Sequence, residues 1–174
     1  MSSLNKGVSK VEVTLKWNPS RLGEPDHDLD LVAATFAAGD PTGKPVYLVH
    51  FGSRSPDGTI TLNRDSRTGQ GFGTDEEMTL ELDRLNASFA RVVVGVAIQQ
   101  RDRRRTFADI ATPEIRFAEG YTELLEYAFA DVQDSTAATV AECVRAPSGA
   151  WEFRPSVRGF DADPAHFASV MGTR

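Results

Sequence analysis

The sequence predicts an all-β fold: a β-sandwich of two mostly antiparallel sheets with short peripheral helices. Two observations lead to this prediction. Short segments in which apolar and polar residues alternate recur along the 174-residue chain, and turn-forming residues separate them. No long helical segment lies between the strands, so a parallel α/β sheet is not expected. We expect a single domain covering residues 1–174.

Alternation is clearest in residues 11–17, where Val11, Val13, Leu15 and Trp17 share one face. The continuous apolar run at residues 91–98 is typical of a strand buried on both faces. An apolar run also follows the acidic residues 26–31. The other predicted strands occupy residues 45–51, 59–62, 78–82, 112–117, 121–129, 138–145 and 151–157.

Turn signals lie between these strands, at residues 37–44, 55–58, 118–121 and 146–149. We expect a short helical turn at residues 107–111. A helix is expected at residues 163–171, with Asp163 as its N-cap and Pro164 at the first helical position.

The charge balance and cysteine content indicate the class of protein. The net charge is -6, from 25 acidic and 19 basic residues, which disfavours nucleic acid as a partner and suits cations. The single cysteine, Cys143, fits a reducing compartment. The N-terminal residues lack the apolar stretch of a signal peptide, and the apolar run at 92–98 is too short to span a bilayer. We therefore predict a cytoplasmic protein without a transmembrane segment.

Two acidic segments are the candidate functional features. If a strand begins at residue 26, alternation places Asp26, Asp28 and Asp30 on one face and Leu29 in the core. A second segment, residues 63–77, holds three glycines spaced two residues apart, and acidic residues lie on both sides of them. Its members are Asp65, Gly69, Gly71, Gly73, Asp75, Glu76 and Glu77.

A hard divalent cation would explain clustered carboxylates around a glycine-rich loop. Ca²⁺ takes about six to eight oxygen ligands, and glycine lets the backbone turn tightly around an ion. The all-oxygen set disfavours zinc. Two ordinary interpretations stay open: a solvated strand edge for the first segment and a hairpin tip for the second. The loop matches neither an EF-hand nor a phosphate-binding glycine loop.

Five sequence blocks carry a resemblance to a known family: LKWNP, DHDLDLVAATF, SPDGTI, DSRTGQGFGTDEE and WEFRPSVRGF. With them, nearly the whole chain resembles the TerD family of bacterial tellurium-resistance and stress proteins. The resemblance implies a β-sandwich that binds Ca²⁺ through the DLD segment and the glycine-rich acidic loop. By position it assigns the site to Asp28, Asp30, Asp65, Gly69, Gly71, Gly73, Asp75 and Glu76.

The chain also departs from the family pattern. Phe72 and Thr74 stand where the family usually has acids, and Gly52 and Ser53 replace a usual pair of asparagines. We therefore expect one well-occupied ion and at most one weak second site. The ligands of the well-occupied ion would be loop carbonyls and the side chains of Asp28, Asp30, Asp65, Asp75 and Glu76. The usual family segment IHDA is here IQQRD, so any role of that histidine is absent.

The arginine-rich segment, His27 and three aromatic residues are further candidates, and each also has an ordinary structural interpretation. The segment RDRRR, from Arg101 to Arg105, is either a solvated turn or a docking site for an anionic partner. His27 lies between two aspartates, which would raise its pKa or orient its ring. Trp17, Trp151 and Phe153 are expected in the core.

The predicted function is a non-catalytic, calcium-binding stress-response module, with calcium ions and other stress-response proteins as partners. No serine elbow or cysteine–histidine signature supports an enzyme. Two alternatives remain. One is a divalent-metal-dependent phosphoesterase, and the other is a scaffold that docks an acidic partner through the loop from Arg101 to Arg105.

Overall fold

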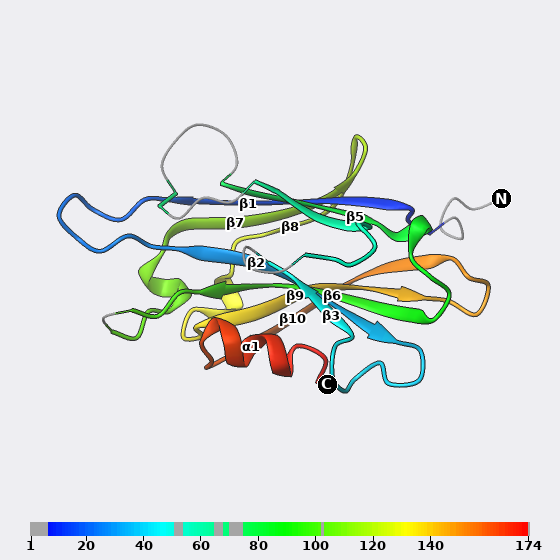
Figure 1. The fold of residues 1–174 in the computed structure, drawn as a ribbon. Coiled ribbons are helices and arrows are strands. Elements are labelled where there is room, and N and C mark those ends of the chain that lie inside the picture. The colour runs from blue at the N-terminus through cyan, green and yellow to red at the C-terminus, as the bar shows by residue number, and fades with distance from the viewer. Residues whose placement is uncertain (1–6, 51–53, 65–67, 70–74, 102, 174) are drawn as a thin grey trace.

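Two five-stranded antiparallel sheets lie face to face in the computed structural model (Figure 1). The structure describes residues 7–50, 54–64, 68–69, 75–101 and 103–173. The first sheet has the order β4 (Ile60–Arg64), β5 (Glu76–Glu81), β1 (Lys10–Asn18), β7 (Ala111–Glu119) and β8 (Thr122–Tyr127). The second has the order β10 (Trp151–Phe160), β9 (Ala137–Arg145), β6 (Phe89–Ile98), β2 (Leu29–Ala37) and β3 (Tyr47–Val49). The predicted fold class is confirmed.

The main core lies between the two sheets. On β1, Val11, Val13, Leu15 and Trp17 are each at most 1% exposed, as the alternating pattern predicts. The residues between them, such as Glu12 and Lys16, are exposed. This alternation is what an antiparallel sheet with one buried face requires.

A second, smaller core covers the outer face of the second sheet. The only α-helix of the described residues, α1 (Pro164–Val170), lies against this face (Figure 1). Its Phe167 packs with Val32 and Phe36 of β2. A Cβ atom on Gly95 of β6 would lie 2.6 Å from the Phe167 ring, so glycine allows the helix to approach. Strands β2 and β6 are thus buried on both faces, which explains their continuous apolar runs.

The helix begins as predicted, because Asp163 Oδ1 accepts a hydrogen bond of 2.8 Å from the backbone N–H of His166. The helical turn η3 (Phe107–Asp109) is also present where it was expected. The turns η2 (Leu82–Arg84) and η4 (Ala130–Val132) were not predicted. None of the helices in the described part of the chain is long and apolar enough to cross a bilayer.

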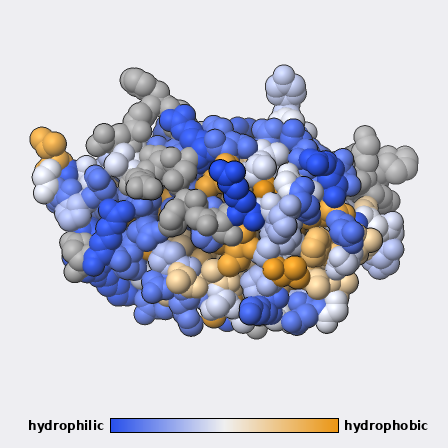
Figure 2. Space-filling model, in the orientation of Figure 1, coloured by the Kyte–Doolittle hydropathy of each residue, from blue (hydrophilic) through white to orange (hydrophobic). Residues whose placement is uncertain are grey.

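Hydrophilic residues cover most of the face shown in Figure 2, with apolar residues in smaller groups between them. Isolated exposed apolar residues are usual on folded proteins. Among the described residues, the most exposed large apolar side chains are Leu22 and Tyr121, each fully exposed on a separate loop. This surface therefore offers no single dominant apolar patch in the view shown.

Cys143 is expected to be unreactive in the folded protein. Its thiol is 2% exposed, and burial, with the nearby Glu142 and Glu119 carboxylates, raises its pKa to about 12. Only the thiolate is nucleophilic, so alkylation by iodoacetamide at pH 8 should be roughly 1000-fold slower than in urea. Mass spectrometry of quenched samples would measure both rates. Equal rates would show that the thiol is accessible in the native state.

Candidate metal centre

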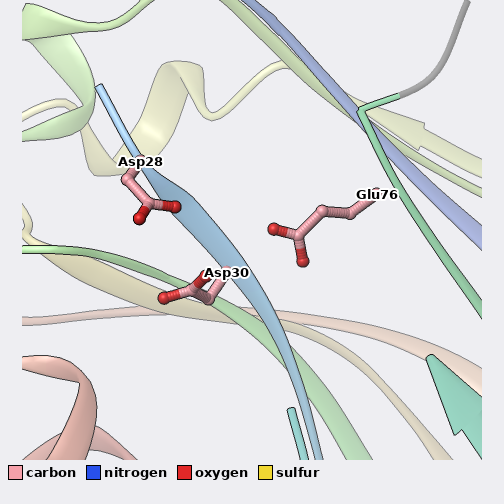
Figure 3. A group of neighbouring side chains, drawn as sticks. All are labelled: Asp28, Asp30 and Glu76. Atoms are coloured by element: carbon pink, nitrogen blue, oxygen red, sulfur yellow. The ribbon is translucent and has the colours of Figure 1, made fainter. Parts of the chain in front are cut away.

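Three buried carboxylates converge where the two sheets meet at one side of the sandwich. Asp28 and Asp30 lie at the start of β2, and Glu76 is the first residue of β5 (Figure 3). One oxygen from each carboxylate lies within 4.8 Å of the others. The residues are 6%, 2% and 0% exposed, respectively. The group therefore joins one sheet to the other through acidic side chains.

A hydrogen bond to the backbone of β2 positions Glu76. Among the described residues, strand β3 pairs with β2 from Ala33 to Thr35. Nearer the start of β2, the backbone N–H of Leu31 donates a hydrogen bond of 2.9 Å to Glu76 Oε1. Glu76 shares the inward face of β5 with Met78 and Leu80, which are buried in the main core. The strand register thus delivers this carboxylate to β2.

Two side chains after β6 contact the aspartates. Gln99 Nε2 donates a hydrogen bond of 2.5 Å to Asp30 Oδ2. Arg101 Nη2 lies 3.0 Å from Asp28 Oδ2, forming an ion pair between a half-exposed guanidinium and a buried carboxylate. The backbone N–H of Gln99 also donates to the Asp28 carbonyl, at 2.8 Å. These contacts fix the positions of both aspartates.

The donor set of this group fits a hard divalent cation. It contains only carboxylates, which are the ligands that Ca²⁺ and Mg²⁺ prefer. Carboxylates this close repel one another, and burial removes the water that would screen them. A bound cation would offset this cost. Ca²⁺ suits the arrangement better than Mg²⁺, because it accepts variable geometry and more ligands.

Trp17 links the two acidic segments to each other. Its backbone N–H donates to Asp75 Oδ2 at 2.8 Å, and its indole Nε1 donates to the His27 carbonyl at 2.9 Å. Gly69 lies against the ring: a Cβ there would be 2.5 Å from Nε1, and its φ is +74°. The prediction of a core position is confirmed by its 1% exposure. The linking role was missed, although a buried indole N–H normally needs a partner.

The predicted site residues have different positions relative to the group. Asp28, Asp30 and Glu76 come together, whereas Asp75 is not part of this group and accepts a hydrogen bond from Trp17. Gly69 packs on the Trp17 ring. Asp65, Gly71 and Gly73 lie outside the described residues, as do Phe72, Thr74, Gly52 and Ser53. Their predicted roles remain predictions.

Asp26 does not join the other two aspartates. Strand β2 begins at Leu29, so strand alternation does not extend back to residue 26, and Asp26 is exposed. Leu29 points into the main core, as expected. The prediction of three aspartates on one strand face is therefore wrong: only Asp30 lies in β2, and Asp28, which precedes the strand, joins it in the acidic group.

The expected rise in the pKa of His27 is wrong. Burial lowers the pKa of this imidazole, and the charge of Arg105 lowers it further; weaker opposing effects come from Glu24 and Asp109. Arg105 Nη1 lies 3.2 Å from His27 Nε2. Because a guanidinium only donates, Nε2 accepts this hydrogen bond and the ring is neutral. Neighbours in sequence were a poor guide, since Asp26 is exposed and Asp28 pairs with Arg101.

Three arginines of the loop from Arg101 to Arg105, the arginine loop, contact other parts of the protein. Arg104 pairs with Asp161 at 3.1 Å and donates to the Asp134 carbonyl at 2.8 Å. Arg105 is 4% exposed and contacts His27, while Arg101 contacts Asp28. Arg103 is exposed. The interpretation as a simple solvated turn thus applies to part of the loop only.

Asp57 serves the turn at residues 55–58. Its Oδ1 accepts hydrogen bonds from Ser55 Oγ at 2.6 Å, Thr59 Oγ1 at 2.7 Å and the Thr59 backbone N–H at 3.1 Å. Burial alone would raise the pKa of Asp57, but these hydrogen bonds outweigh it and lower the pKa below its usual value. This carboxylate is committed to local structure rather than to the acidic group.

Comparison with known proteins gives a consistent assignment. The model of the TerD domain matches residues 1–169. The chain is 30% identical over 177 residues to the tellurium resistance protein TerD of an Alcaligenes species, covering 99% of this chain and 92% of the relative. It is 25% identical over 178 residues to general stress protein 16U of Bacillus subtilis, with the same coverage of 99% and 92%.

A solved structure extends the similarity to the fold. The crystal structure of a homologue of the telluride resistance protein from Streptomyces coelicolor A3(2) superposes with a TM-score of 0.94. The two chains are 57% identical, and the match covers 96% of this chain and 99% of that one. The similarity thus includes both sheets and the strands that carry the acidic group.

Proposed function

Because this chain belongs to the TerD family, we propose that it is a non-catalytic module of bacterial stress response and tellurium resistance that binds Ca²⁺. The observation that carries this proposal is the convergence of Asp28, Asp30 and Glu76, whose ligand atoms lie within 4.8 Å of one another. Two sheets contribute to the group, so an ion there would hold the sandwich together. Further ligands from the loop before Asp75, including Asp65, are part of the proposal.

The ion would act by stabilising a binding surface or by promoting assembly with other stress-response proteins. The names of the relatives, a tellurium resistance protein and a general stress protein, support this physiological context. The cytoplasm is the proposed location, with the single buried thiol as support. Tellurite reduction by this thiol is not part of the proposal, because its raised pKa makes it unreactive.

The position of His27 supports a non-catalytic role. This imidazole, one residue before Asp28, is buried and accepts a hydrogen bond from Arg105. A general base needs access to a substrate proton, which the position of His27 does not offer. We expect no hydrolysis of generic phosphoesters with Mg²⁺ or Mn²⁺. Turnover that disappears on substitution of Asp30 would instead favour the phosphoesterase alternative.

Ca²⁺ is expected to raise the melting temperature of the metal-free protein. An ion that binds only the folded state adds about 2.7 kcal/mol at a hundredfold excess over Kd. For a chain of this size that corresponds to roughly 5–10 °C. Differential scanning calorimetry in Ca²⁺, Mg²⁺ and chelator would measure it, with Mg²⁺ giving the smaller shift. Superimposable curves in Ca²⁺ and chelator would exclude the ion site.

Isothermal titration gives the stoichiometry. The described residues hold one group of three carboxylates, which supports our expectation of one tight binding event and at most one weak second event per chain. Two tight and equivalent events would contradict this expectation and would point to additional ligands.

A further inference from the structure

The ion pair between Arg101 and Asp28 is asymmetric in its surroundings. The two side chains approach to 3.0 Å, but the Arg101 side chain is 53% exposed and the Asp28 side chain is 8% exposed. The carboxylate is fixed at the start of β2, where the Asp28 carbonyl also accepts from Gln99. The guanidinium reaches it from the loop after β6. One partner is therefore held in the protein interior while the other can move into water.

We propose that Arg101 is a tethered cation that competes with the divalent ion for Asp28 and so sets the affinity of the site. This inference rests on the proposed function, because it assumes that the acidic group binds an ion. Arg101 supplies positive charge to the empty group and must give up that position, or suffer repulsion, when an ion binds. Either way, the arginine lowers the affinity for the ion.

Three physical features favour competition over a supporting role. A guanidinium stays charged at every physiological pH, so it repels a divalent cation that shares its carboxylate. Its exposure makes departure cheap, because a solvated guanidinium regains water in place of the ion pair. Gln99 differs from Arg101 because its amide is neutral. It donates a hydrogen bond to Asp30 and can orient that carboxylate without repelling a cation.

Release of Arg101 would also change the protein surface. Arg103, in the same loop, is already exposed. A displaced Arg101, already 53% exposed in the ion pair, would present its whole guanidinium to solvent in the same loop when the site is loaded. Ion binding beside the first part of β2 would thus be communicated to the loop from Arg101 to Arg105.

The test compares four variants by calorimetric titration of metal-free protein with Ca²⁺. Arg101→Gln removes the charge but keeps hydrogen-bond donors, and Arg101→Ala removes both. Arg101→Lys keeps the charge. Arg103→Ala is the matched control, because it removes the same charge from the same loop at an exposed position. Thermal melts in chelator would verify that each variant is folded.

We expect Arg101→Gln and Arg101→Ala to bind Ca²⁺ roughly threefold to tenfold more tightly than the wild type. Arg101→Lys and Arg103→Ala should stay within about twofold, since one retains the charge and the other removes a solvent-screened one. Unchanged or weaker binding by both Arg101→Gln and Arg101→Ala would overturn the inference, and weaker binding would make Arg101 a positioning residue for Asp28.

The two proposals can fail separately. Wild-type binding with no gain in Arg101→Gln leaves the ion site intact and rejects competition. Binding by Arg101→Gln but not by the wild type would reject the proposed function of the native chain while supporting competition. Failure of every variant to bind Ca²⁺ would reject both.

Discussion

Replacing Glu76 with glutamine is expected to weaken Ca²⁺ binding by about a hundredfold or more while leaving the fold intact. Calcium affinity depends strongly on the number of charged ligands, and this change removes one of three converging carboxylates. The glutamine carbonyl can still accept the hydrogen bond that Leu31 donates to Glu76 Oε1. The structural contact is thereby kept and the charge is lost.

The metal-free variant should melt at the wild-type temperature or above it. Fewer like charges meet in its acidic group, and the new amide can donate to a neighbouring carboxylate. Calorimetric titration would measure affinity, and thermal melts in chelator would measure stability. Wild-type affinity in this variant would remove Glu76 from the site.

Glu77→Gln provides the matched control for Glu76→Gln. It makes the same chemical change at the next residue of β5, where strand alternation places the side chain on the opposite face. Glu77 lies opposite Thr14 of β1 in the first sheet. We expect a change in Ca²⁺ affinity of less than about twofold. Equal losses in both variants would indicate a general effect of net charge.

Replacing Trp17 with alanine is expected to destabilise the protein by about 3–5 kcal/mol, the usual cost of removing a buried tryptophan. The indole is 1% exposed and lies in the main core. Trp17→Phe is more informative, because it keeps an aromatic ring and removes the N–H that donates to His27. The buried carbonyl of His27 then loses its donor, at a cost of about 1–3 kcal/mol.

Trp17→Phe should also weaken Ca²⁺ binding several-fold, since His27 immediately precedes Asp28, a proposed ligand. Urea denaturation in chelator would give the free energy of unfolding, and calorimetric titration would give the affinity. Trp151→Phe is the control: Trp151 is 3% exposed, and its Nε1 makes no hydrogen bond with the described residues. Equal effects of the two substitutions would mean that the hydrogen bond to His27 is unimportant.

The fold could be predicted because its strands carry strong local signals. The alternation in β1 and the apolar runs of β2 and β6 reflect which faces are buried, and the structure places them accordingly. Boundaries were harder. The acids before β2 extended the predicted strand to residue 26, but the described strand begins at Leu29. Charged residues can alternate in exposed loops as well as in strands. The two-residue alternation alone therefore did not define the first residue of β2.

The direction of Glu76 depends on the register of β5, of which it is the first residue. Adjacent residues of a strand point to opposite faces, so a shift of one residue would turn Glu76 away from the core. The sequence did contain the relevant signal: Met78 and Leu80 share the parity of Glu76, and all three face inward. The resemblance alone assigned both Asp75 and Glu76 to the site, without distinguishing their directions.

Contacts between distant residues could not be predicted from local patterns. Arg101 and Asp28 are 73 residues apart, and the indole of Trp17 meets the segment before Asp28 only when β1 and β2 lie in facing sheets. The sequence interpretation of the arginine segment considered an external anion. The structure provides an internal one, because the fold places the end of β6 beside the start of β2.

The hydrogen bond between Leu31 and Glu76 joins residues 45 positions apart, on strands of different sheets. Because such a non-local contact forms more slowly than local structure, we expect the acidic group to assemble late, after the sheets have docked. An ion that needs the assembled group has little to bind in the folding transition state. Calcium would therefore act mainly by slowing the opening of the finished sandwich, which gives the loaded protein a longer native lifetime.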